Sequence, residues 1–199
     1  MRRTVNRAQA VDHALFRRAT RSPAPRIDAV LYPLSDVAAK ARLWIAIASM
    51  LAIGGGPAGR RAAARGLVSI SGASLLANVV LKPITRRRRP APIVDLWLTR
   101  TAPLPRTTSF PSGHSASAAA FATGVALELP GIGVPLGAAA VAVGWSRVRT
   151  RVHYPSDVIV GLAIGVAVGL ATTRRWPLDR HRADLDEPGV TPRDGSSDH

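Results

Sequence analysis

The chain has 199 residues and no cysteine, which is the length of one domain and excludes disulfides and thiolate metal sites. Its formal net charge of +15 suits nucleic acid, anionic lipid headgroups or a phosphorylated substrate as partner. Apolar residues make up 47% of the sequence, and arginines gather at the edges of the apolar runs. This distribution is typical of a membrane protein with interfacial arginines, so we expect membrane lipids as partners and no nucleic acid.

The N-terminal region, residues 1–42, is polar and basic. Its apolar residues Val5, Ala8, Val11 and Leu15 recur on one helical face, which predicts a helix. Such a helix lies either on the membrane surface or packed against the domain in water. The region has no apolar run of the length that a secretory signal peptide needs.

Five apolar segments without Lys, Arg or Asp follow. They cover residues 43–56, 66–81, 116–129, 132–145 and 158–172. Each is shorter than the roughly 20 residues that span a bilayer, and neutral flanking residues extend most of them. We therefore predict an all-α, multi-pass membrane bundle of five helices over residues 43–175, with a sixth left open. The alternative, a soluble all-α domain, would have little amphipathic surface to face water.

The C-terminal part carries two further patterns. Gly161, Gly165 and Gly169 recur every four residues, which either lets helices approach closely in lipid or reflects chance in a Gly/Ala-rich chain. Residues 176–199 are polar, with acidic residues, Pro and Gly, and are predicted to be a disordered tail.

Three polar stretches lie between the apolar segments, at residues 82–90, 111–115 and 146–157. The stretch at 82–90 follows the apolar segment 66–81, and the stretch at 111–115 precedes the next apolar segment, 116–129. Both stretches therefore lie on one side of the membrane. Two crossings separate the second stretch from the third, which returns it to that side. All three are therefore predicted to meet at one face.

The first stretch places Lys82 and Arg89 seven residues apart around a run of arginines. A phosphate dianion needs several charge-assisted donors, and arginine supplies a planar bidentate fork. We expect Lys82 and Arg89 to bind phosphate, and Arg86–Arg88 to meet lipid headgroups.

The second stretch, Pro111-Ser112-Gly113-His114-Ser115, precedes an apolar helix. A helix N-terminus offers free backbone N–H groups to a phosphate, and Gly113 lets the backbone approach a ligand. His114 can protonate a leaving oxygen. The alternative is an ordinary helix cap beside an unrelated histidine.

The third stretch places Arg147, His153 and Asp157 six and four residues apart. A carboxylate four residues from a histidine can hold one ring nitrogen protonated and leave the other free to attack. Arg147 can neutralise charge that develops on phosphoryl oxygens. Asp157 can also cap the fifth helix, and the two roles are compatible.

Together these residues resemble the three signatures of the PAP2 superfamily: K-x6-R-P, P-S-G-H and S-R-x5-H-x3-D. The resemblance implies a helical core shared with the vanadium haloperoxidases and a metal-independent phosphatase without a cofactor. It implies that His153 is the nucleophile, Asp157 its orienting partner and His114 the acid. The phosphate cradle that it implies consists of Lys82, Arg89, Ser112, Gly113 and Arg147.

The expected function is removal of phosphate from a lipid phosphate or diphosphate through a phosphohistidine, with a polyprenyl-linked phosphate favoured. The alternatives are a phosphatidylglycerophosphate or phosphatidate phosphatase and a haloperoxidase-like enzyme. A non-enzymatic basic membrane protein explains Arg86–Arg88 but not the histidines. With five spans, 19 of the 27 lysines and arginines share the side of the site, which favours a cytoplasmic site. The sequence does not indicate an oligomeric state.

Overall fold

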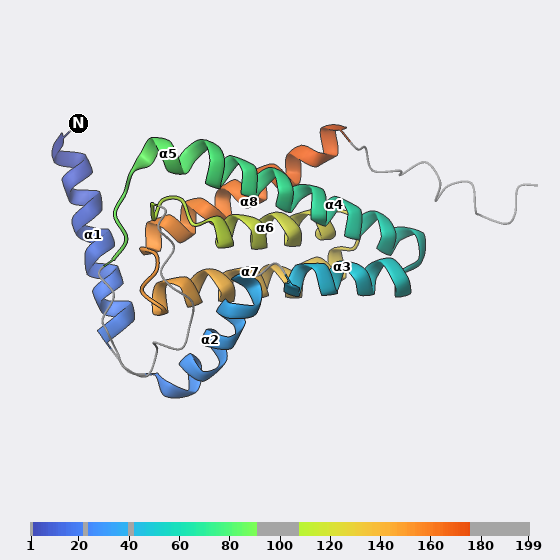
Figure 1. Cartoon of the computed structure of the whole chain (residues 1–199), viewed down its shortest axis with the longest axis horizontal. Coiled ribbons are helices and arrows are strands. Elements are labelled where there is room, and N and C mark those ends of the chain that lie inside the picture. Colours follow the sequence, from blue (N-terminus) through green and yellow to red (C-terminus); the bar gives the residue numbers. More distant parts are fainter. Residues whose placement is uncertain (1, 22–23, 40–41, 91–107, 176–199) are drawn as a thin grey trace, which may run out of the picture.

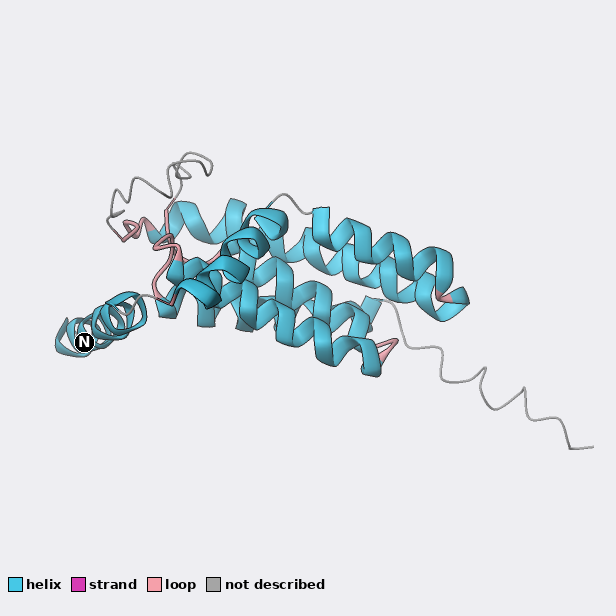
Figure 2. Cartoon of the chain, turned by 90° about the horizontal axis from the view of Figure 1, so that it is seen from below, coloured by secondary structure: helices cyan, strands magenta, loops and turns pink. Residues whose placement is uncertain are grey.

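The computed structural model describes residues 2–21, 24–39, 42–90 and 108–175, and these residues form helices and connecting turns (Figures 1 and 2). The elements are α1 (Arg2–Arg21), α2 (Pro25–Ala39), α3 (Arg42–Gly54), α4 (Gly56–Leu75), the π-helical η1 (Leu76–Leu81), α5 (Lys82–Thr85), α6 (Gly113–Ala126), α7 (Pro130–Arg149) and α8 (Pro155–Arg175). No strand occurs within these ranges, and the predicted all-α class is confirmed. The tail predicted at 176–199 lies outside them.

The five predicted apolar segments correspond to α3, the continuous α4–η1–α5, α6, α7 and α8. Three helical stretches are long and apolar enough to cross a membrane: Gly56–Thr85, Pro130–Arg149 and Pro155–Thr172. Large apolar side chains are exposed along their outer faces, where lipid tails would solvate them. Examples are Val68, Leu75, Val79, Val134, Val141, Ile159 and Leu170. The prediction of a multi-pass membrane bundle is confirmed.

Helix α6 is the centre of the bundle and packs against α4, α7 and α8. It is rich in alanine and most of its residues are buried, so its neighbours can approach it closely. Phe121 on α6 and Trp44 on α3, with ring centroids 5.3 Å apart, form part of the core between the two helices. Helix α6 therefore faces protein rather than lipid over most of its 14 residues.

The predicted glycine stripe on α8 is the contact surface between α8 and α6. A Cβ on Gly161 would lie 2.5 Å from the Ser112 carbonyl oxygen, and one on Gly165 would lie 2.3 Å from the Ala116 carbonyl oxygen. Neither distance is compatible with a side chain, so the close approach requires glycine. This confirms that the stripe serves helix packing and does not merely reflect chance in a Gly/Ala-rich chain.

Helix α4 begins at Gly56, ten residues before the predicted start of its apolar segment. Its first turns contain Arg61 and Arg65, whose guanidinium groups bind the Glu128 carboxylate, Arg61 through Nε at 3.1 Å and Arg65 through Nη2 at 2.8 Å. Pairing with a carboxylate lets Arg65 lie buried in the bundle. The start expected for this segment, placed after the last arginine, was wrong because Glu128 neutralises these arginines within the helix.

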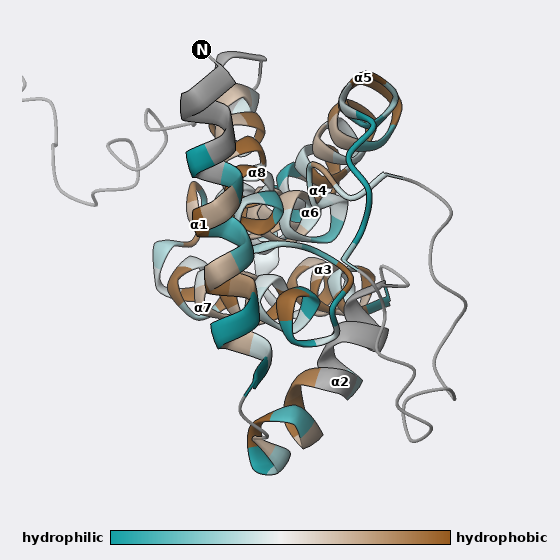
Figure 3. Cartoon of the chain, turned by 90° about the vertical axis from the view of Figure 1, so that its left-hand side faces the viewer, coloured by the Kyte–Doolittle hydropathy of each residue, from teal (hydrophilic) through white to brown (hydrophobic). Residues whose placement is uncertain are grey.

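Helix α1 lies across one end of the bundle, as Figures 1 and 3 show. Its contacts are with α7 and α8. The Arg149 guanidinium at the end of α7 binds both carboxylate oxygens of Asp28 on α2, at 2.9 and 2.6 Å, and donates to the Ala19 carbonyl oxygen on α1. The N-terminal helices are thus attached to the end of the bundle where α7 meets α8.

Candidate active site

The three polar stretches meet at the end of the bundle where α6 and α8 begin. Two hydrogen bonds join the first stretch to the two residues just before the second: Thr85 Oγ1 donates to the Phe110 carbonyl at 2.7 Å, and the Ser109 amide to the Arg87 carbonyl at 2.9 Å. The Ser112 amide donates to the Asp157 carbonyl at 2.9 Å and so joins the second stretch to the third. These hydrogen bonds therefore fix the relative positions of all three stretches.

The second stretch is positioned by the start of α6. Ser112 is the N-cap residue, and its hydroxyl oxygen accepts hydrogen bonds from the Ser115 amide at 3.4 Å and the Ser115 hydroxyl at 2.9 Å. Both serine side chains are buried. Gly113 and His114 follow in the first turn, where the helix dipole and free N–H groups favour an anion.

His153 and Asp157 form a buried pair. His153 Nδ1 lies 3.5 Å from Asp157 Oδ2, which is longer than a hydrogen bond, and it has no closer partner among the described residues. The same Asp157 oxygen accepts a hydrogen bond from the Tyr154 amide at 2.9 Å. The carboxylate therefore faces Nδ1 and leaves Nε2 directed away from it.

The other ring nitrogen of His153 faces Arg89. Arg89 Nη1 lies 3.3 Å from His153 Nε2 and donates to the Val152 carbonyl oxygen at 3.0 Å, while Nη2 donates to the Thr108 carbonyl oxygen at 3.3 Å. These carbonyl contacts hold the guanidinium plane beside Nε2. An anion bound by Arg89 would therefore lie next to that nitrogen.

Lys82, Arg147 and His114 complete the cluster. Lys82 Nζ donates to Asn78 Oδ1 at 2.6 Å, and it lies close enough to Arg89 and Arg147 for the three positive charges to repel one another. His114 lies within electrostatic range of the same three cations and of His153. A bound phosphate dianion would offset this repulsion, as is expected of an anion-binding site.

Burial keeps the His153 ring neutral. It lowers the pKa of His153 to about 4; Asp157 opposes this shift, and Arg89 and Arg147 add to it. The ring is therefore unprotonated at neutral pH, the state that a nucleophile requires.

Arg87 differs from its predicted role. Its Nη1 donates to Asp157 Oδ1 at 2.7 Å, and its Nη2 binds Asp12 on α1. The assignment of Arg87 to lipid headgroups is wrong, because two carboxylates neutralise it inside the protein. Arg86 and Arg88 are exposed.

Asp12 is a residue that the sequence interpretation missed. Its carboxylate accepts hydrogen bonds from the Ser156 amide at 2.9 Å and the Ser156 hydroxyl at 2.6 Å. Burial alone would raise its pKa, but the bonds from Ser156 and Arg87 lower it below the ordinary value. The available signal was that Asp12 is the single acidic residue in a helix with six arginines.

The described residues contain no group of three or more His, Cys, Asp or Glu side chains placed to hold a metal ion. The donors that converge here are cations and neutral rings, which suit a phosphate rather than a divalent cation.

Comparison with known proteins gives consistent results. The profile of the PAP2 superfamily matches residues 63–180. A lipid A 1-phosphatase from Rhizobium johnstonii is 43% identical over 101 residues, 49% of this chain and 41% of the relative. A decaprenylphosphoryl-5-phosphoribose phosphatase from Mycobacterium tuberculosis is 41% identical over 96 residues, 46% of this chain and 49% of the relative. The matches thus span about half the length of these relatives.

The fold comparison covers more of the chain. The crystal structure of a transmembrane PAP2-type phosphatidylglycerolphosphate phosphatase from Bacillus subtilis aligns with 89% of this chain and 90% of its own, with a TM-score of 0.66 and 27% identity. The three signatures, at Lys82–Pro90, Pro111–His114 and Ser146–Asp157, all lie within the matched region. Because the profile covers more than half of the chain and the fold agrees, this membrane protein belongs to the PAP2 superfamily.

Proposed function

We propose that the protein is a lipid phosphatase that transfers the phosphoryl group of a lipid phosphate to His153 and then to water. The observation that carries this proposal is the position of His153 Nε2, 3.3 Å from Arg89 Nη1, while Nδ1 faces Asp157. A phosphate held by Arg89 lies beside the nitrogen that the carboxylate leaves free. That is the geometry an attacking nitrogen needs.

In the proposed first step, His153 Nε2 bonds to phosphorus as the bond to the lipid oxygen breaks. Lys82, Arg89 and Arg147 bind the equatorial oxygens, with the Ser112–Gly113 turn at the start of α6 completing the cradle. Asp157 stabilises the positive charge that develops on the ring. The departing oxygen takes a proton from His114, whose protonated form is favoured by the negative charge of the bound substrate.

In the second step, a water molecule attacks the phosphohistidine. His114, neutral after the first step, accepts a proton from that water as the P–N bond breaks. Inorganic phosphate leaves, and both histidines return to their starting states. Catalysis rests on positioning and charge stabilisation in this scheme, as is general for phosphoryl transfer.

The proposed substrate is a phosphate or diphosphate on an apolar chain, with a polyprenyl carrier favoured. Exposed apolar residues continue from the membrane face of α4 to the site: Val79 is 62% exposed, Val80 46% and Ile84 72%. They flank Lys82 and provide a surface along which a lipid tail can lie. The named relatives act on lipid A, a decaprenyl phosphoribose and a phosphatidylglycerophosphate, all of which combine a phosphate with apolar chains.

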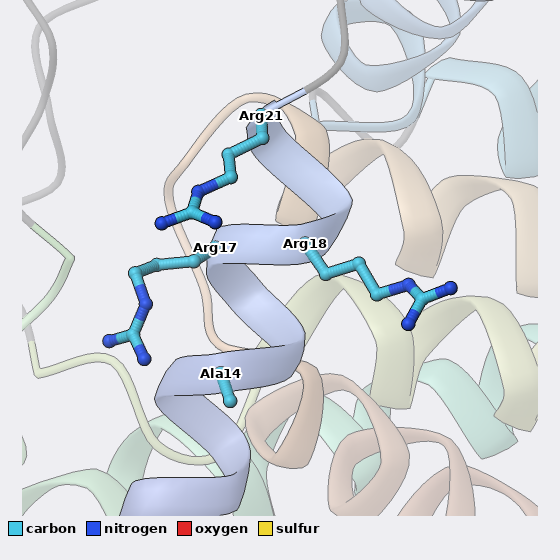
Figure 4. Close-up of a pocket in the computed structure, with 4 residues that line it drawn as sticks. All are labelled: Ala14, Arg17, Arg18 and Arg21. Atoms are coloured by element: carbon cyan, nitrogen blue, oxygen red, sulfur yellow. The ribbon is translucent and has the colours of Figure 1, made fainter.

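We also propose that α1 lies in the plane of the membrane surface. Val11 and Leu15 are 59% and 50% exposed. Arg17, Arg18 and Arg21 line a surface depression with Ala14 (Figure 4), Arg17 and Arg21 extending to one side of the helix and Arg18 to the other. Exposed apolar and cationic side chains on one helix suit an anionic headgroup layer. The positive-inside bias supports a cytoplasmic location for this end of the bundle and for the site.

The competing activity with a similar cradle is halide oxidation with bound vanadate. The membrane-spanning helices and the phosphatase names of the relatives weigh against it. Phosphatidylglycerophosphate and phosphatidate remain the competing substrates.

The test is phosphate release by the detergent-purified full chain from four lipids: a polyprenyl phosphate, a polyprenyl diphosphate, phosphatidylglycerophosphate and phosphatidate. We expect turnover of at least one and the fastest turnover with a polyprenyl compound. A protein that released no phosphate from any of them, but oxidised bromide after vanadate was added, would overturn the proposal.

A further inference from the structure

We propose that Asp12 and Arg87 are positioning residues for the His153–Asp157 pair, so that α1 must be seated on the bundle for phosphoryl transfer. This inference rests on the proposed function. Arg87 lies between two carboxylates: Nη1 is 2.7 Å from Asp157 Oδ1, and Nη2 binds Asp12 Oδ2. Asp12 thus acts on Asp157 through Arg87, although 75 residues of chain separate Asp12 from Arg87.

The first step of the argument concerns the orientation of Asp157. Its two oxygens have different partners, Arg87 on Oδ1 and the Tyr154 amide on Oδ2. The gap from Oδ2 to His153 Nδ1 is 3.5 Å, just beyond hydrogen-bond length. A small rotation of the carboxylate either closes this gap or opens it. The position of the Arg87 guanidinium therefore sets how well Asp157 supports the histidine.

The second step concerns what holds Arg87. Its guanidinium carbon lies 4.3 Å from the centre of the Tyr154 ring, a cation–π distance. Nη1 also donates to the Ser156 hydroxyl at 2.7 Å, and that hydroxyl in turn donates to Asp12. The side chain of Asp12 is 7% exposed and that of Arg87 23%. Asp12 is the contribution of α1 to this buried network, in which each partner limits the movement of the others.

The third step concerns charge. Asp157 must retain negative charge toward His153 when the ring becomes positive, and an arginine bound to Asp157 alone would neutralise it. A second carboxylate, Asp12, shares the Arg87 charge and leaves the group of three with a net charge of −1. Without Asp12, Arg87 would also be free to turn toward the phosphate, where Lys82, Arg89 and Arg147 already supply positive charge.

The seating of α1 depends on contacts beside this network. The rings of His13 and Phe16 lie 4.7 and 5.2 Å from the ring of Tyr154. Tyr154 follows His153 directly and stacks on Arg87. Displacing α1 would therefore remove the Asp12 carboxylate and uncover Tyr154 together.

The test compares Asp12→Asn with Asp28→Asn, a matched control. Asp28 also joins an N-terminal helix to the bundle through an arginine, Arg149 at the end of α7, and that guanidinium also donates to the Ala19 carbonyl oxygen on α1. The measurement is the single-turnover rate of phosphohistidine formation with a labelled lipid phosphate, together with KM. We expect about a tenfold slower rate for Asp12→Asn with little change in KM, a size usual for an outer partner of a reacting group, and no slowing for Asp28→Asn.

The double variant makes the test sharper. If Asp12 acts through Arg87, then Asp12→Asn adds no further slowing to Arg87→Met, because the effects of residues that act as one unit are not additive. Additive effects would overturn the inference, as would equal slowing in Asp12→Asn and Asp28→Asn. Arg87→Lys keeps the charge but cannot bridge two carboxylates, so it should also be slow, and it replaces Asp12→Asn if that variant does not fold. A wild-type protein that forms no phosphohistidine would contradict the proposed function instead.

Discussion

The backbone of Gly113 lies against the side-chain amide of Asn78, so closely that a Cβ on Gly113 would be 2.7 Å from Asn78 Oδ1. The same oxygen accepts the 2.6 Å hydrogen bond from Lys82 Nζ. Asn78 lies in the π-helical turn η1, a type of irregularity that often marks functional sites. We therefore expect Gly113→Ala to displace the Asn78 amide and release Lys82, lowering kcat/KM for lipid phosphate at least about tenfold.

Further variants identify the cause of that loss. Asn78→Ala removes the acceptor of Lys82 and should lower kcat/KM by a similar factor, whereas Gly137→Ala on α7, where a Cβ meets nothing within 4 Å, should leave it unchanged. Gly113→Ala/Asn78→Ala should be no slower than Asn78→Ala, because the added methyl group then has room. A double variant slower than Asn78→Ala would show that the methyl group acts through another contact.

Alanine variants of the two histidines should differ in the phosphatase activity that remains. His153→Ala removes the nitrogen that, in the proposed mechanism, bonds to phosphorus, so we expect no turnover and no acid-labile phosphoenzyme. His114→Ala removes the proposed proton donor. Loss of such a donor usually slows a reaction roughly 10²–10⁴-fold, so a trace of turnover should remain. Labelled phosphate, trapped on the protein and released by acid, measures both effects. A phosphoenzyme in His153→Ala would require another nucleophile.

Parts of the site that are local in sequence could be predicted from the sequence, and parts that depend on distant contacts could not. The four-residue spacing brings His153, just before α8, close to Asp157 in the first turn of α8, and the glycine stripe of α8 indicated its packing face. Arg87 looked like part of a lipid-facing run because its partner, Asp12, is 75 residues away. The early start of α4 was hidden because Arg65 is neutralised by Glu128, 63 residues later.

The fall of kcat/KM at acid pH should occur well below the pKa of an ordinary histidine. Burial lowers the pKa of His153 to about 4, whereas a histidine of pKa about 6.5 is largely protonated at pH 5. His153, the proposed nucleophile, is thus neutral at pH 5. The value of kcat/KM, corrected for ionisation of the substrate phosphate, should fall only near pH 4. A fall at pH 6.5 would contradict this assignment.

The same pKa shift has a consequence for stability. Because the unfolded chain takes up a proton on His153 near pH 6.5 and the folded protein only near pH 4, stability falls as the pH drops through that interval. His153→Asn should weaken this dependence in thermal unfolding experiments. An unchanged slope between pH 4 and 6.5 would show that other groups dominate it.

Chelation should not remove the activity. The positive charges that would stabilise the transferred phosphoryl group are those of Lys82, Arg89 and Arg147, so we expect full phosphate release after dialysis against EDTA. Added Mg²⁺ should not raise kcat. Loss of activity on chelation, restored by one metal ion, would mean that the cations of the site are insufficient.

The proposed orientation can be tested directly because the chain contains no cysteine. Arg18→Cys places a thiol on the exposed side of α1, at the end of the bundle that carries the site. Gly131→Cys places one in the first turn of α7 at the opposite end, where a Cβ meets nothing within 4 Å. With a cytoplasmic site, a membrane-impermeant maleimide should label Gly131→Cys in intact cells and Arg18→Cys only after permeabilisation. The reverse pattern would place the site outside and leave the arginines of α1 as an exception to the positive-inside bias.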